Sequence, residues 1–128
     1  MTAGAKHKGA VGAVISGRCR DTAEHVAARF PVFARGHSTV GQSPFTRPSA
    51  IQVPLIIRPD GDQQGFPAVV VHPGDYIVAD MDGVVCVPSG MIEEVARVAR
   101  KGKEADERCM VDIRAGLGVK ESFRRHRT

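Results

Sequence analysis

Arg20 and Asp21 are adjacent in the sequence, and Glu24 follows three residues later. A guanidinium presents a planar fork of N–H donors that matches a carboxylate or a phosphate. A carboxylate beside it can hold a hard cation, directly or through water. These three side chains therefore have the chemistry of a site for an anionic substrate and a metal ion. Arg-Asp pairs that follow strands are also common as solvated ion pairs, and that interpretation stays open.

The elements around this pair predict a strand, a turn and a helix. Residues 11–15 are an apolar run that predicts a strand, which we expect Gly17 to end. Residues 22–29 predict a helix that Thr22 caps and that has Glu24 in its first turn. Its predicted apolar face comprises Ala23, Val26, Ala27 and Phe30. The junction of a strand end and a helix start is where α/β folds commonly bind ligands.

Several motifs in order resemble the RraA-like family, which includes the 4-hydroxy-4-methyl-2-oxoglutarate aldolases and the regulator of ribonuclease E activity A. The first is Arg20-Asp21-x-x-Glu24, which is similar to the family's Arg-Asp-x-x-Glu/Asp signature. The others are residues 30–36 (FPVFARG), residues 73–88 (PGDYIVADMDGVVCVP) and the fungal-type ending at residues 118–127 (GVKESFRRHR). The resemblance covers roughly residues 9 to 127, and the agreement of separated motifs makes it specific at family level.

The resemblance implies an α/β fold, namely a swivelling β/β/α domain of the phosphohistidine-domain-like kind, here truncated at its N-terminal side. It implies a metal-dependent aldolase that cleaves 4-hydroxy-4-methyl-2-oxoglutarate to pyruvate and also decarboxylates oxaloacetate. Arg20 would be the catalytic and substrate-binding residue for a small 2-oxo acid. Asp21 would hold Mg²⁺, or another divalent cation such as Mn²⁺, and Glu24 would hold a metal-bound water.

The resemblance also bears on how much of a family member is present and on assembly. The chain resembles the C-terminal portion, without the glycine-containing loop that precedes the Arg-Asp pair in the family. Family members form rings of three subunits, sometimes stacked into six, so we expect a homotrimer or hexamer. The alternative is a non-catalytic, protein-binding regulator of the RraA-like kind or an inactive fragment. Lysine Schiff-base chemistry is the competing aldolase route, but it needs a desolvated lysine, and all the lysines lie in polar sequence.

Length and composition restrict the class of protein. A chain of 128 residues with 42% hydrophobic residues predicts one domain, over residues 10–127, after a disordered lead-in at residues 1–9. The net charge of +4 is concentrated near the basic end, but no aromatic-interleaved basic patch indicates nucleic-acid binding. Three widely spaced cysteines without a C-x-x-C pattern indicate reduced thiols in a cytoplasmic protein. No apolar run is long enough to span a membrane.

The remaining elements follow from periodicity and turn residues. We expect a loop over residues 37–49, a strand over 51–57 with Pro54 at an edge or bulge, and a turn-rich insertion over 58–66. A strand over 68–71 precedes a hairpin of residues 76–80 and 84–87, whose turn contains Asp82-Gly83. A long helix from Gly90 to about Ala115 and a short helix over 119–126 complete the chain.

Other polar residues suggest weaker hypotheses. Asp75, Asp80 and Asp82 form an acidic cluster that suggests a metal site, although aspartates in turns more often bond to the local backbone. His37 is placed to contact a ligand or a neighbouring subunit, although histidines in loops are usually solvated. Arg35-Gly36 ends a predicted strand and is a candidate to face the same cleft as Arg20.

Overall fold

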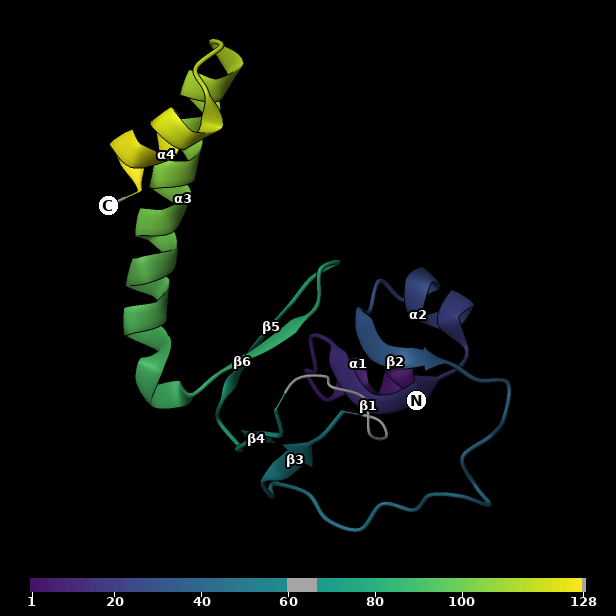
Figure 1. The fold of residues 1–128 in the computed structure, drawn as a ribbon. Helices are drawn as coiled ribbons and strands as arrows, with labels where there is room; N and C mark the ends of the chain where they lie inside the picture. The colour runs from purple at the N-terminus through teal and green to yellow at the C-terminus, as the bar shows by residue number, and fades with distance from the viewer. Residues whose placement is uncertain (60–66, 128) are drawn as a thin grey trace. The chain divides into compact units, whose positions relative to one another are not determined.

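The computed structural model describes residues 1–59 and 67–127 and is a mixed α/β structure (Figure 1). The chain groups into two compact units. The first comprises Met1–Pro73 and Val78–Val85, and the second comprises Gly74–Ile77 and Cys86–Thr128. The one domain predicted from residue 10 to 127 thus corresponds to two units in the structure. No helix among the described residues is both long enough and apolar enough to cross a bilayer.

A parallel strand pair forms the centre of the first unit. Strand β1 (Ala13–Cys19) pairs with β2 (Val32–His37), and helix α2 (Thr22–Ala27) lies between them in sequence. The residue before β1 is Gly12, and a larger residue would be crowded there because its Cβ would lie 3.1 Å from the Pro31 carbonyl oxygen. The strand–turn–helix order predicted around the Arg-Asp pair is confirmed.

The predicted end of the first strand at Gly17 is wrong, because β1 continues to Cys19. Ile15 pairs with Ala34 and Arg18 pairs with Gly36, so β1 has one residue more than β2 between these pairs. Gly17 lies in this interval, as is common for glycines inside strands, which often mark a bulge. The glycine therefore bends the strand without ending it.

Helix α1 (Thr2–His7) occupies the segment that the sequence predicted to be a disordered lead-in. Thr2 is 3% exposed, and its Oγ1 lies 2.6 Å from Nδ1 of His25 on α2. The Lys6 ammonium donates to the Ala28 carbonyl at 2.5 Å, just after the last residue of α2. These contacts are far apart in sequence, so local composition gave no indication of them.

The described residues contain two further strand pairs, each a separate two-stranded sheet. Strands β3 (Leu55–Ile57) and β4 (Val69–Val71) pair antiparallel, and β5 (Tyr76–Ala79) pairs with β6 (Val84–Val87). Strand β3 begins directly after Pro54, which lacks the N–H that a ladder needs. The hairpin prediction is confirmed to within one residue. Residues 60–66 of the predicted insertion lie outside the described residues.

The second unit is dominated by a helical hairpin. A short 3₁₀ turn, η1 (Ser89–Met91), leads into α3 (Ile92–Arg114), and α4 (Val119–His126) folds back along α3 (Figure 1). Gly116, at φ +92°, ends α3 in a Schellman motif, in which its N–H donates to Ile113 and that of Leu117 to Asp112. The long and the short helix are both where the sequence predicted them.

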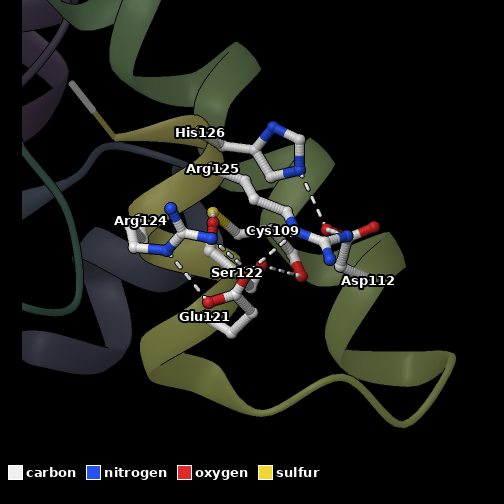
Figure 2. A network of polar contacts seen from close by, with 7 residues as sticks. All are labelled: Cys109, Asp112, Glu121, Ser122, Arg124, Arg125 and His126. Atoms are coloured by element: carbon white, nitrogen blue, oxygen red, sulfur yellow. Dashed lines mark hydrogen bonds and ion pairs between the residues drawn. The ribbon is translucent and has the colours of Figure 1, made fainter.

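Small buried groups and several polar contacts around them hold α4 against α3 (Figure 2). Cys109 and Ser122 are 3% and 0% exposed, and the Ser122 hydroxyl donates to the Cys109 carbonyl at 3.3 Å. Around them, His126 Nε2 lies 3.0 Å from an Asp112 oxygen, and Arg127 bonds to Asp106 at 2.6 Å. The basic end of the chain is thus partly paired within its own chain.

Ser122→Val is expected to lower the free energy of unfolding by about 1–3 kcal/mol, because the added methyl has no space and the hydroxyl bond is lost. Urea unfolding followed by far-UV circular dichroism measures this change. Lys120→Val is the matched control, since Lys120 is exposed on the same helix. Equal stability of the two variants would contradict the tight packing inferred for Ser122.

Candidate active site

The carboxyl-terminal edge of β1 and β2 brings together the polar residues that follow both strands. Cys19 and His37, the last residues of the two strands, are paired, and the Ser38 N–H donates to the Cys19 carbonyl at 2.8 Å. Because the strands are parallel, the residues after each one leave the sheet at the same edge. This edge is the usual ligand-binding position in open α/β sheets.

Arg20 and Asp21 form an exposed ion pair at this edge. Arg20 Nε lies 3.2 Å from Asp21 Oδ2, and the side chains are 51% and 52% exposed. A pair this exposed contributes little to stability. Both side chains are therefore exposed to solvent, and the binding role of Arg20 stays a prediction.

Asp21 takes a left-handed backbone conformation, with φ 60° and ψ 36°. It occupies the N-cap position of α2, but its side chain makes no capping hydrogen bond. Its backbone carbonyl accepts from the N–H groups of Glu24 and His25. The prediction that Thr22 caps the helix is wrong, because Thr22 is already the first helical residue. Aspartate tolerates this conformation better than most residues, so the turn is compatible with a carboxylate here.

The fit of the predicted metal residues is limited to two carboxylates. Glu24 is exposed on the first turn of α2, three residues after Asp21. Within residues 1–59 and 67–127, no three His, Cys, Asp or Glu side chains gather closely enough to hold a metal ion. Mg²⁺ is commonly held by one or two carboxylates with water and substrate oxygens, and Asp21 and Glu24 are two exposed carboxylates at this edge.

Arg18, which the sequence analysis did not single out, also reaches this edge. Its Nη1 donates to the His37 carbonyl at 3.0 Å, across Gly36, where a Cβ would lie 4.0 Å from the same nitrogen. Arg18, His37, Ser38 and Thr39 line a hollow of about 400 Å³. The sequence feature that could have indicated Arg18 is its two-residue spacing from Arg20, because residues at this spacing lie on the same side of an extended chain.

Arg35 has a different environment from the one suggested for it. Its guanidinium donates to the Ser16 hydroxyl at 2.9 Å and to the Arg58 carbonyl. These contacts lie along the middle of the strand pair and toward β3. His37, in contrast, does line the hollow beside Arg18, as a residue of β2 rather than of the loop that we expected.

The hairpin aspartates that suggested an alternative metal site have local structural roles. Asp80 Oδ1 accepts from the N–H groups of Asp82 and Gly83, which closes the turn between β5 and β6. Asp75 accepts from the Ser89 N–H at 3.1 Å and lies 3.8 Å from the Cys86 sulfur. Partial burial and then the Asp75 charge raise the pKa of the Cys86 thiol, which favours the neutral, unreactive form.

Comparison with known families gives one match that includes the whole edge. The family model described as "RraA-like: Aldolase/RraA" matches residues 1–86. This range contains β1, α2, β2 and every residue of the candidate site, and it ends at Cys86 on β6. It also includes residues 1–9, where the resemblance noted in the sequence had not extended.

Two relatives are similar to this chain in sequence. A protein of Halalkalibacterium halodurans named "Putative 4-hydroxy-4-methyl-2-oxoglutarate aldolase" is 38% identical over 103 residues, which are 80% of this chain and 44% of the relative. An uncharacterized protein of Methanocaldococcus jannaschii is 30% identical over 117 residues, which are 91% and 51% of the two chains. The chain spans about half the length of these curated relatives.

Among solved structures, the crystal structure of an uncharacterized protein from Pseudomonas syringae pv. tomato is similar to this chain. The TM-score is 0.81 and the sequence identity is 32%. The alignment covers 95% of this chain and 56% of that one. The similarity in fold and the similarity in sequence therefore agree over nearly the whole chain.

Proposed function

The chain belongs to the RraA-like family, and we propose that it is a divalent-metal-dependent aldolase that cleaves 4-hydroxy-4-methyl-2-oxoglutarate to pyruvate and decarboxylates oxaloacetate. The observation that carries this proposal is the exposed Arg20-Asp21 pair at the carboxyl-terminal edge of two parallel strands. The name of the Halalkalibacterium halodurans relative supports this choice of substrate. We also propose a cytoplasmic protein whose strand pairs are part of a swivelling β/β/α domain.

Arg20 has the role of binding the substrate and balancing the charge that develops on it. Cleavage of the C–C bond leaves an electron pair on the pyruvyl fragment, and the negative charge moves to the enolate oxygen. Loss of carbon dioxide from oxaloacetate leaves the same enolate, so one donor serves both reactions. A guanidinium held in place before the reaction stabilises this charge without reorganising. Arg20 lies beside Asp21 at the strand end, with Nε 3.2 Å from Asp21 Oδ2.

Asp21 and Glu24 are the residues that would hold Mg²⁺, or another divalent cation such as Mn²⁺. When bound, the cation supplies Lewis-acid stabilisation of the 2-oxo acid. Asp21 is free of a capping role, so its carboxylate is open to the cation. Glu24 would orient a cation-bound water, since outer carboxylates commonly hold the ligands of a metal.

The competing aldolase route through a lysine Schiff base has no support in the surroundings of the lysines. That chemistry needs a lysine whose pKa is lowered by desolvation or by a neighbouring cation. All five lysines, at positions 6, 8, 101, 103 and 120, are exposed. We therefore favour the metal-dependent route.

The second candidate function is a non-catalytic, protein-binding RraA-like regulator or an inactive fragment. Two observations favour it: the described residues contain no group of three metal-ligating side chains, and the chain covers 44% of the length of the named aldolase. Pyruvate released from 4-hydroxy-4-methyl-2-oxoglutarate with Mg²⁺, measured with coupled lactate dehydrogenase, separates the two. Mg²⁺-dependent release supports the aldolase, and no release above the uncatalysed rate supports the regulator or fragment.

Arg20→Ala is expected to reduce turnover by roughly 10²–10³-fold, which is the usual cost of removing one donor to a developing oxyanion. The fold should be unchanged, because Arg20 is exposed and packs against no core. The pyruvate assay and a far-UV spectrum measure both effects. Arg100→Ala on α3 is the control for loss of one positive charge. Near-normal activity of Arg20→Ala would remove Arg20 from the proposed mechanism.

Asp21→Asn is expected to raise the Mg²⁺ concentration needed for half-maximal activity by about tenfold or more, because a neutral amide binds a hard cation more weakly. Asparagine also tolerates the left-handed backbone of this position, so the turn should persist. A Mg²⁺ titration of the pyruvate assay measures the shift, with Glu104→Gln as the charge control. An unchanged requirement would place the cation on other ligands.

We also propose that the chain assembles as a homotrimer, or as a hexamer of two trimers. Several large apolar side chains of the β5–β6 hairpin are exposed, including Tyr76 at 52%, Val78 at 59% and Val85 at 61%. Exposed strands with such side chains favour association. Light scattering at micromolar concentration should give three or six times the monomer mass. A monomer that melts cooperatively would refute this assembly.

A further inference from the structure

We infer that the hollow lined by Arg18, His37, Ser38 and Thr39 is a subsite for the distal carboxylate of a dicarboxylic 2-oxo acid. The inference rests on the proposed function, in which Arg20 binds the 2-oxo acid end of the substrate. It adds a specificity-determining role for Arg18, a residue that is outside the Arg-Asp-x-x-Glu motif.

The chemistry of the lining side chains selects an anion. Arg18 carries five N–H donors, and the described contacts use one of them, on the His37 carbonyl at 3.0 Å. The Ser38 hydroxyl accepts from the Val40 N–H at 3.1 Å, which leaves its own hydrogen to donate. Thr39 adds a second hydroxyl, and no carboxylate is among the lining residues. A group of donors around one cation favours a carboxylate over a neutral or cationic ligand.

The position of the hollow joins it to Arg20. A Cβ at Gly36 would lie 4.0 Å from Arg18 Nη1, and a Cβ at Gly41 would lie 3.9 Å from Arg20 Nη1. The segment from Gly36 to Gly41 therefore passes near both guanidinium groups, with a glycine at each of the two positions. Two cations beside one short segment suit a ligand that carries a carboxylate at each end.

The size of the hollow is also consistent with a small acid. Its volume of about 400 Å³ is at the lower end of the range of small-molecule sites. The side chains of Arg18, His37 and Thr39 are exposed, so the ligand can enter without displacing packed groups. Arg18 would hold its guanidinium in place through the His37 carbonyl, which lowers the entropy lost on binding.

The test compares two ligands that differ only at the distal group. 2-Oxoglutarate and 2-oxopentanoate have the same five-carbon chain, but the second ends in a methyl group. Titration of the ¹⁵N-labelled chain with each acid, in magnesium chloride, gives both affinities from amide shifts. We expect 2-oxoglutarate to bind about tenfold more tightly, as a charge-assisted bond predicts. The shifts at His37, Ser38 and Thr39 should be large with 2-oxoglutarate alone.

Variants assign this preference to the hollow. Arg18→Gln should reduce the ratio of the two affinities to near one. His37→Gln is a second test, because it changes the side chain and keeps the backbone carbonyl to which Arg18 donates. Arg100→Gln, on exposed α3, is the charge control and should leave the tenfold ratio unchanged. Dispersion of the amide spectrum shows whether each variant is folded.

The outcomes separate this inference from the proposed function. If both acids bind equally and Arg20→Gln weakens both, the subsite is wrong and the Arg20 site stands. If neither acid binds, both are wrong for this chain. Inorganic phosphate is titrated in parallel, since the same donors suit it. Tighter binding of phosphate than of 2-oxoglutarate, with shifts at Ser38 and Thr39, would overturn the carboxylate subsite in favour of a phosphate site.

Discussion

The parallel pairing of β1 with β2 is the interaction on which the candidate site depends. It joins Cys19 to His37 at one edge, so that Arg20 and Ser38 leave the sheet side by side. The extra residue of β1 between Ile15 and Arg18 sets the register of that edge, and it determines that Arg18 lies opposite Gly36. A Cβ at position 36 would lie 4.0 Å from the Arg18 guanidinium, which is an ordinary contact distance. The bulge therefore sets the position from which Arg18 reaches the His37 carbonyl at the end of β2.

Three aspartates of this chain have different roles, and the partners of each carboxylate indicate its role. Asp80 accepts two backbone N–H groups and closes a turn, and Asp75 joins Ser89 to the base of the hairpin. Their charge is used in holding local structure. Asp21 lies at a helix N-terminus without a side-chain capping bond, and its carboxylate pairs with the neighbouring Arg20. An oxygen of Asp21 is thus directed to a cation, at the edge where the candidate site lies.

The sequence predicted the elements whose signals are local. The α3 and α4 helices follow from periodicity and from Gly116, and the β5–β6 hairpin follows from Asp82-Gly83, whose turn Asp80 completes. The sequence missed what depends on distant contacts. Helix α1 is fixed by His25 and Ala28, the Gly17 bulge by pairing with β2, and the Arg18 hollow by the return of the chain at residues 37–39. Arg20 was predicted at the junction of a strand and a helix, because the apolar run before it and the helical pattern after it are both local in the sequence.

The second unit shows why a basic end is not by itself evidence for an anionic partner. Arg124 and Arg125 both donate to Glu121 (Figure 2), and these hydrogen bonds lower the pKa of Glu121. Arg127 lies over the Phe123 ring and donates to Asp106. Each of these three arginines has an acidic partner on α4 or on α3. At the β1–β2 edge the balance is different. Arg18 donates to a carbonyl, which carries no net charge, and Arg20 shares one aspartate. The Arg18 guanidinium at the strand edge is therefore a positive charge whose described contact is not with an acidic group.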